Sequence, residues 1–209
     1  MRFLPLLLRN LLRKKIRTTL TILSIAVALF LFGLLATINT AFQQGVEAAG
    51  ADRLVVRNKT SIIMPLPYSY RDRMLQVDGV SAVTYASWFG GVYQDRRNFF
   101  PQFAIDKDTY MQMYPEFVLP KDQMDAFLRD REGCIVGRKT AERFKWKLGD
   151  RIPIQGTIFT GTWEFNVRGI YDGKRPEDDT TQFMFRHDYF DERRQFGRGE
   201  VGWYIVRVN

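Results

Sequence analysis

The side chains that most often carry out chemistry in proteins are scarce in this sequence and lie far apart. There is one cysteine, Cys134, and one histidine, His187. A Cys/His metal site needs several such ligands. A serine hydrolase needs a nucleophile beside a base, often in a G-x-S-x-G string, which does not occur. His187 stands in a charged stretch, so we expect it to be exposed. We therefore predict no catalytic residue, no metal ligand and no cofactor.

Three other segments partly match chemical motifs but fit structural roles better. The string from Gly156 to Gly161 has the outer glycines of a phosphate-binding loop but lacks the lysine that should follow, so we interpret it as a hairpin. The acidic run 177–179 lies in a proline-containing segment, which favours a solvated loop over weak cation binding. Cys134 lies in the apolar string Cys-Ile-Val and is predicted to be a buried core residue.

An aromatic cluster around two arginines is the best candidate for contact with another molecule. Such a cluster could stack on nucleic-acid bases, but strand alternation explains most of its rings as one surface packed on a core. An exposed subset would suit a partner protein or a lipid-like cargo. The candidate contact residues are Trp88, Phe89, Arg96 and Arg97, and the neighbouring rings are Tyr93, Phe99 and Phe100.

The net charge of +8 comes almost entirely from the N-terminus. Six of the 31 Lys and Arg residues precede Thr18 with no acid among them, which leaves 25 bases against 23 acids in the rest of the chain. An uncharged run, Thr18 to Val46, follows directly. Basic residues beside an apolar run are typical of a cytoplasmic membrane surface rather than of a nucleic-acid binder. We assign that surface to Arg9, Arg13, Lys14, Lys15 and Arg17.

The uncharged run contains a segment with the length and composition of a transmembrane helix. Leu20 to Ile38 would extend about 28 Å as a helix, roughly the thickness of the hydrocarbon layer. The positive flank predicts that the N-terminus lies in the cytoplasm and the rest of the chain outside. The residues predicted to span the membrane are Leu20, Ile22, Leu23, Ile25, Val27, Leu29, Phe30, Leu31, Phe32, Leu34, Leu35 and Ile38.

Two other interpretations of this segment stay open. A cleaved signal peptide would have a shorter apolar core with its cleavage site close behind, whereas the nearest suitable triplet is Ala49-Gly50-Ala51. A buried helix of a soluble protein is rarely apolar all round over this length.

The residues ahead of the span repeat leucines at every fourth position opposite a row of arginines. This pattern favours an amphipathic helix at the membrane surface over a plain basic flank.

Beyond residue 51 the pattern alternates short strands and short helices, which is typical of an α+β fold. A bend is expected at Gly90-Gly91. We expect strands at 52–58, 81–93, 99–105, 133–136, 151–155, 158–160, 163–171, 181–186 and 201–208. We expect helices at 68–76, 107–114, 121–130 and 137–146, and a helical or irregular segment at 188–195.

The order of these segments resembles a known family. It begins with "RTTLTILSIAVALFLFGLL", continues with "DRLVV" and "VDGVSAVT", and ends with a block that contains "VGRKTAERF", "LGDRIPI" and "FNVRGIY". The sequence is similar to permease subunits of MacB/LolC/FtsX-type ABC transporters over nearly its whole length. The charge and hydropathy pattern predicts a basic amphipathic cytoplasmic segment at 1–17 and a transmembrane helix with an extension at 18–46. The resemblance implies a periplasmic α/β domain at 47–209, with a smaller β-rich insertion at about 137–179.

The resemblance implies a non-catalytic permease in the bacterial inner membrane. Its expected partners are a cytoplasmic ABC ATPase, membrane lipid, a second permease copy or homologue, and a periplasmic partner or lipoprotein-like cargo. Permeases of this family continue into a C-terminal domain with three more transmembrane helices, so we expect a truncated or partial permease. The alternative is a single-pass, membrane-tethered binding or scaffold module without ATP coupling. A third option is an anchored enzyme.

Overall fold

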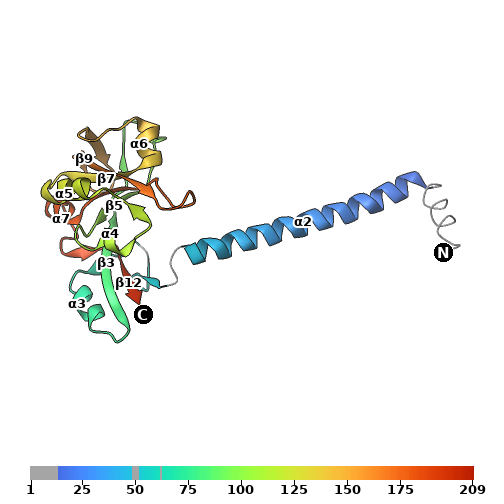
Figure 1. The fold of residues 1–209 in the computed structure, drawn as a ribbon, viewed down its shortest axis with the longest axis horizontal. Helices are drawn as coiled ribbons and strands as arrows, with labels where there is room; N and C mark the ends of the chain where they lie inside the picture. The colour runs from blue at the N-terminus through green and yellow to red at the C-terminus, as the bar shows by residue number, and fades with distance from the viewer. Residues whose placement is uncertain (1–13, 49–51, 62) are drawn as a thin grey trace. The chain divides into compact units, whose positions relative to one another are not determined.

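The computed structural model describes residues 14–48, 52–61 and 63–209 (Figure 1). Contacts divide the chain into two units, the N-terminal unit at residues 1–51 and the body at residues 52–209. The predicted amphipathic surface segment, with Arg9 and Arg13, falls on residues 1–13 and lies outside the described residues.

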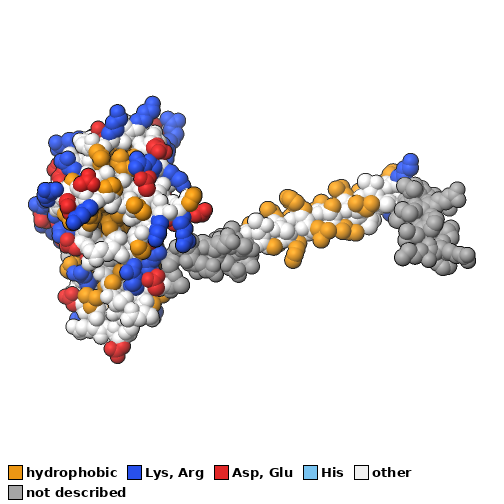
Figure 2. All heavy atoms as spheres, in the orientation of Figure 1, with side chains coloured by type: hydrophobic (Ala, Val, Ile, Leu, Met, Phe, Trp, Pro, Cys, Tyr) orange, Lys and Arg blue, Asp and Glu red, His pale blue; other side chains and the backbone are white. Residues whose placement is uncertain are grey.

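The described part of the N-terminal unit is a single helix, α2 (Lys15–Ala48). Its segment Lys15–Ile38 is long and apolar enough to cross a membrane, and none of its apolar stretch is buried against other residues. Figure 2 shows apolar side chains along this helix and Lys and Arg side chains near its N-terminal end. A helix of a soluble protein buries one apolar stripe and exposes a polar face. Because α2 exposes apolar side chains on every side, a lipid environment matches its surface best.

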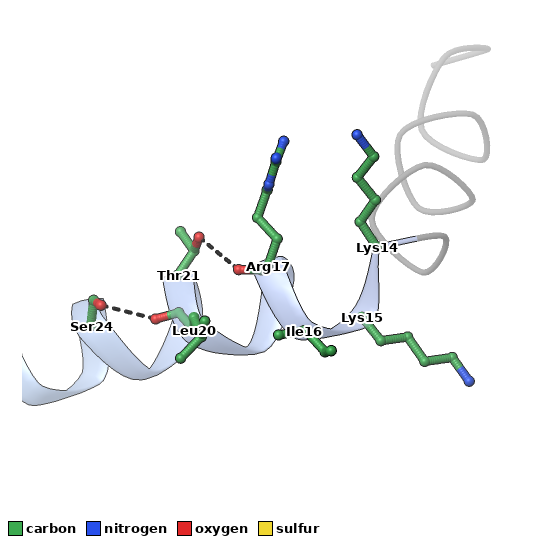
Figure 3. Close-up of a pocket in the computed structure, with 7 residues that line it drawn as sticks. All are labelled: Lys14, Lys15, Ile16, Arg17, Leu20, Thr21 and Ser24. Atoms are coloured by element: carbon green, nitrogen blue, oxygen red, sulfur yellow. Dashed lines mark hydrogen bonds between the residues drawn. The ribbon is translucent and has the colours of Figure 1, made fainter.

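Three hydroxyl side chains within this apolar segment are satisfied by the helix itself. Thr21 and Ser24 donate their hydroxyls to the carbonyls of Arg17 and Leu20, each over 2.9 Å, as Figure 3 shows. Thr37 donates to the carbonyl of Gly33 over 2.8 Å. Hydroxyls bonded four residues back need no water, which is the condition that the interior of a bilayer sets for polar groups.

The body is built on one mixed sheet. Its described strands are ordered β1-β12-β3-β5-β10-β7-β9-β8-β4, with β6 paired to β9. Strand pairs are antiparallel except β5 with β10 and β7 with β9. The strands are β1 (Arg53–Val56), β3 (Val80–Trp88), β4 (Gly91–Val92), β5 (Gln102–Ile105), β6 (Phe117–Val118), β7 (Gly133–Gly137), β8 (Arg151–Gly156), β9 (Gly161–Gly173), β10 (Phe183–Arg186) and β12 (Trp203–Val208). A second, two-stranded sheet joins β2 (Leu66–Pro67) to β11 (Glu200–Val201).

Helices cover both faces of the main sheet because its strands are apolar on both sides. Consecutive residues of β10, Phe183, Met184 and Phe185, enter different cores in alternation. One core includes residues of α6 (Arg138–Phe144) and α7 (His187–Arg193), and the opposite core includes residues of α4 (Tyr110–Met113) and α5 (Lys121–Arg129). A third cluster packs α3 (Tyr70–Leu75) and the small sheet against β3 and β12.

The predicted α+β class is confirmed, and two expected strands differ in detail. Residues 158–160 form a turn, because β8 and β9 pair as far as Gly156 with Gly161 and leave only four residues to close the hairpin. The long strand predicted at 81–93 ends at Trp88. Gly90 has a positive φ of 67°, a conformation that glycine adopts readily, and the chain then pairs with β8 through β4. The strands within 137–179 join the main sheet.

Candidate binding surface

The end of β3 separates two neighbouring aromatic residues that the sequence analysis grouped together. Phe89 is 0% exposed, whereas Trp88 is 37% exposed. Phe89 packs against five rings, with centroid distances of 5.1 to 6.4 Å, and these belong to Phe159, Trp163, Phe165, Phe185 and Phe190. Phe89 therefore supports the surface from within the core, and a partner molecule can reach only Trp88 of the two.

Trp88 belongs to a row of rings that we call the aromatic strip, made of Phe99, Trp88, Phe103 and Trp203. Trp88 stacks on Phe99 with centroids 6.2 Å apart and meets the edge of Phe103 at 5.6 Å. Phe103 meets Trp203 at 5.7 Å. Phe99 is exposed. The strip thus brings together residues from β3, β5, β12 and the loop before β5.

The two arginines among the predicted contact residues, Arg96 and Arg97, form a basic tip on an exposed turn between β4 and β5. Arg97 donates through Nε and Nη2 to the two carboxylate oxygens of Asp95, each over 3.1 Å. This pairing lowers the pKa of Asp95 and raises that of Arg97. Arg96 forms no ion pair with any residue in the described parts of the chain, so its positive charge is not compensated there. It lines a shallow hollow of about 360 Å³ beside β8.

A larger cavity, which we call the aromatic cavity, lies beside the strip. Its volume is about 550 Å³. The wall includes Trp88 and Trp203 from the strip, the β8–β9 turn and the segment that follows α7. Thr157 of that turn donates its hydroxyl to the carbonyl of Gly90, which holds the turn against the end of β3. The lining residues are Ile63, Pro65, Ser87, Trp88, Ile158, Phe159, Phe190, Arg194, Phe196, Gly197, Glu200, Gly202 and Trp203.

Ser87, which lines the aromatic cavity, lies beside the buried His187, and the geometry of this pair decides whether it could be catalytic. Ser87 Oγ lies 3.3 Å from His187 Nε2. Ser87 Oγ also accepts the N–H of Gly202 over 2.9 Å. The other side of the imidazole is held by the backbone of Glu200 rather than by a carboxylate. A serine whose oxygen already accepts an N–H, beside a histidine with no carboxylate to orient it, lacks the arrangement of a catalytic triad. The pair serves to join β3, α7 and the β11–β12 segment.

His187 differs from its predicted exposed position, since it is only 5% exposed. Charged neighbours in the sequence misled the prediction, because α7 turns its first residue toward β3. Burial and, to a smaller extent, the positive charge of Arg194 together lower the pKa of His187 to about 4, against the opposing charges of Asp191 and Asp188. His187 is therefore neutral at pH 7 and accepts a hydrogen bond from Ser87.

We expect the body to lose stability as the pH falls from about 6.5 to 4. In that window the unfolded chain binds a proton on His187 that the folded chain does not, so stability rises with pH. The loss reaches about 3 kcal/mol, since one pKa unit corresponds to about 1.4 kcal/mol. Denaturant unfolding at several pH values measures it. His187→Gln keeps a donor and an acceptor but cannot titrate. An equal pH slope in this variant and the parent would contradict the assignment.

Arg194 is the one charged side chain at the cavity that is almost fully buried, with 3% exposed. It follows α7, and its Nη2 donates to the carboxylate of Asp191 and, over 2.7 Å, to the carbonyl of Glu200. Its Nε is buried without a hydrogen-bond partner among the described residues. Sequence reasoning missed this residue because nothing in the string around it differs from an ordinary charged surface segment.

The other segments considered for chemistry have structural roles. Cys134 is fully buried in β7, and burial raises the pKa of its thiol. The run 177–179 lies in a loop where Asp178 accepts the N–H of Arg175 and Asp179 that of Thr181. Within residues 14–48, 52–61 and 63–209, no group of three or more His, Cys, Asp or Glu side chains could hold a metal ion.

The solved structures that are similar to this chain include the three that follow. The periplasmic region of MacB from Actinobacillus actinomycetemcomitans matches 78% of each chain, with a TM-score of 0.54 and 12% identity. The extracellular domain of the noncanonic ABC-type transporter YknZ from Gram-positive bacteria matches 75% of this chain and 82% of that one, with a TM-score of 0.51 and 14% identity. A domain of a protein described as a permease from Porphyromonas gingivalis matches 75% of this chain and 74% of that one, with a TM-score of 0.50 and 11% identity. At these identities the likeness shows the fold.

The sequence model of the family called MacB-like periplasmic core domain matches residues 18–209 of this chain. No curated protein matches the chain. A mixed sheet of this topology, preceded by an apolar helix and matched over nearly its whole length, defines the class as the periplasmic domain of an ABC-type permease. The chain belongs to the family of MacB-like periplasmic core domains. Permeases of this type act together with ABC ATPases.

Proposed function

We propose that this chain is the permease component of an ABC-type export or extraction system. A separate cytoplasmic ATPase hydrolyses ATP, and α2 transmits the resulting movement to the periplasmic body. The observation that carries this proposal is the family match at 18–209, which begins within α2 and continues through the whole body. The chain contributes binding and movement rather than catalysis, consistent with the geometry of Ser87 and His187.

The proposed location is the bacterial inner membrane, with the N-terminus in the cytoplasm and the body in the periplasm. Lys14, Lys15 and Arg17 are exposed at the N-terminal end of α2, and Figure 3 shows Lys14 and Arg17 extending to the same side of the helix. Cations beside an apolar span remain in the cytoplasm. The proposed division is a basic segment at 1–17, a spanning helix with its extension at 18–46 and a core domain at 47–209, whose part at about 137–179 is a β-rich insertion.

The proposed partners follow from the same architecture. Lipid surrounds α2, the ABC ATPase acts from the cytoplasmic side, and a second permease copy or homologue completes a dimer. On the body, Trp88 of the aromatic strip and the basic tip with Arg96 and Arg97 are the proposed contacts for a periplasmic partner or lipoprotein-like cargo. Nucleic acid is not among the proposed partners, because the body carries nearly equal numbers of bases and acids.

The second candidate function is a membrane-tethered binding module without ATP coupling. It requires a helix able to cross a membrane, which α2 provides, and a body with a surface that can bind a partner. Such a module would use the same aromatic strip and cavity but would need no ATPase.

Co-purification separates the two functions. A tagged chain, expressed in its native host and extracted in mild detergent, is expected to bring down an ABC ATPase that mass spectrometry identifies. The matched control is residues 52–209 behind a cleavable export signal, which keeps the body but removes α2 and should retain no ATPase. Recovery of the full chain without any ABC ATPase, even after cross-linking in the membrane before extraction, would favour the tethered module.

A further inference from the structure

We propose that the aromatic cavity binds the acyl chain of a lipid, with the ester carbonyl of the chain placed at Arg194. This binding depends on the fold of the body alone and not on coupling to an ATPase. A negative result in the co-purification experiment would therefore leave it standing.

The cavity has the size and the walls of a site for an apolar ligand. Its volume of about 550 Å³ lies within the usual range for small-molecule sites, roughly 300 to 1,000 Å³. Eight of its thirteen lining residues are apolar and two are glycines, so three polar side chains remain, those of Ser87, Arg194 and Glu200. Phe159 stacks on Phe196 with centroids 5.1 Å apart, which gives the wall a continuous aromatic surface.

The scarcity of polar groups selects an alkyl chain over a peptide. Each peptide unit brings an N–H and a C=O that need partners once water is removed. Ser87 has none to offer, because its hydroxyl is engaged with His187 and with the N–H of Gly202. A peptide threaded into the cavity would thus leave most of its backbone groups unsatisfied, whereas an acyl chain carries no such groups beyond its carbonyl end.

The polar end of the cavity fits an uncharged carbonyl. The hydrogen bonds that the Arg194 side chain makes to described residues use Nη2, so Nη1 is left to donate to a ligand. A Cβ built on Gly197, a lining residue, would lie 3.9 Å from Arg194 Nη1 and 3.0 Å from Glu200 Oε2. The guanidinium and the Glu200 carboxylate therefore reach the same wall. The charge of Arg194 is already paired with Asp191, so a free fatty-acid carboxylate would add a second negative charge beside Glu200, whereas an ester carbonyl accepts from Arg194 without that penalty.

Exposed apolar residues at the rim of the cavity give the acyl chain of the lipid a route into it. Ile158 on the β8–β9 turn is 49% exposed, and Phe196 is exposed as well. Both side chains would lose contact with water when an acyl chain enters. Since burying one CH₂ group contributes roughly a fourfold gain in affinity, binding should strengthen with chain length until the cavity is filled.

Tryptophan quenching tests the proposal. All four tryptophans lie in the body, and Trp88 and Trp203 line the cavity whereas Trp146 and Trp163 do not. The full chain in nanodiscs of unbrominated lipid is titrated with monoacyl phosphatidylcholine that carries a brominated chain, below its micelle concentration. We expect saturable quenching, most of which disappears when Trp88→Phe and Trp203→Phe are combined. Quenching that rises linearly without saturation, as partition into the disc would give, overturns the proposal.

Matched charge variants locate the site. Ile158→Asp places a carboxylate at the rim and should weaken binding at least tenfold. Leu148→Asp is its control, because Leu148 is 51% exposed but does not line the cavity, and it should bind like the parent. Equal affinity in both variants would overturn the assignment of the binding site to the aromatic cavity.

A competition experiment tests the polar end of the site. Myristate should compete more weakly than unbrominated monoacyl phosphatidylcholine of the same chain length. If myristate competes equally strongly, the placing of an uncharged carbonyl beside Glu200 is overturned.

Discussion

Two arginines in the middle of α2, introduced as Leu29→Arg together with Phe32→Arg, are expected to abolish membrane insertion of the chain. The twelve strongly apolar residues of the span contribute roughly −0.3 to −0.6 kcal/mol each, or about −4 to −7 kcal/mol in total. Two central arginines cost about 6 kcal/mol on the same scale and also remove two apolar residues. The favourable balance is therefore lost. No neighbouring residue shields the positions, since the apolar stretch of α2 is not buried.

Carbonate extraction and labelling from outside the inner membrane measure this effect together. A cysteine introduced as Asp178→Cys in the acidic loop reports where the body is, since the native Cys134 is buried. In the parent, we expect a membrane-impermeant maleimide to label this cysteine once the outer barrier is opened. The double-arginine variant should stay unlabelled and extractable, whereas Leu29→Arg alone should still insert. Insertion of the double variant would contradict the transmembrane assignment, and an unlabelled body in an inserted parent would reverse the proposed orientation.

Phe89→Ala should be among the most destabilising single changes in the body. The ring is fully buried and touches five other rings that come from the β8–β9 turn, β9, β10 and α7. Removing it leaves a cavity between elements far apart in the chain, and a Phe-to-Ala change in such a site costs about 3 to 5 kcal/mol. Denaturant unfolding of residues 52–209, followed by circular dichroism, gives the change in the free energy of unfolding.

The control for Phe89 is Phe99→Ala, ten residues along the chain. Phe99 is 64% exposed and stacks on Trp88, so its removal should cost less than about 1 kcal/mol. The two variants distinguish a residue that stabilises the core from one that belongs to the proposed contact surface. Phe89→Ala should lower stability, whereas Phe99→Ala should leave stability nearly intact and change the surface of the aromatic strip. Similar losses in both would mean that the loop before β5 is as tightly packed as the core.

Local patterns predicted most of the elements of this protein correctly. The helix after Pro120 begins at Lys121, and β8 buries Ile152 and Ile154 in strict alternation, as two-residue periodicity requires. The hairpin at Gly156–Gly161 and the buried Cys134 were likewise predicted from short strings. Such features depend on neighbours in the chain, so a single sequence contains the necessary information.

Burial and the assembly of sites were less predictable. Alternation shows that Trp88 and Phe89 point to opposite sides, but only the packing of α7 and the β8–β9 turn decides that Phe89 is the buried one. His187 is surrounded by charged residues in the sequence and yet lies against Tyr85, with ring centroids 5.0 Å apart. The aromatic cavity gathers segments that begin near residues 63, 87, 158 and 190, and no local signal relates them.

The sequence by itself determined that an uncharged, apolar helix with a basic flank precedes an α+β body, and its block at 136–171 indicated the family. These properties follow from composition and short-range periodicity, which act within a few turns or residues. Only the tertiary structure decided which aromatic rings are exposed, that His187 is neutral and buried, and that Arg194 stands at the wall of an apolar cavity. Each of these depends on contacts between residues that are distant in the chain, because solvent exposure is a property of the packed molecule and not of any one segment.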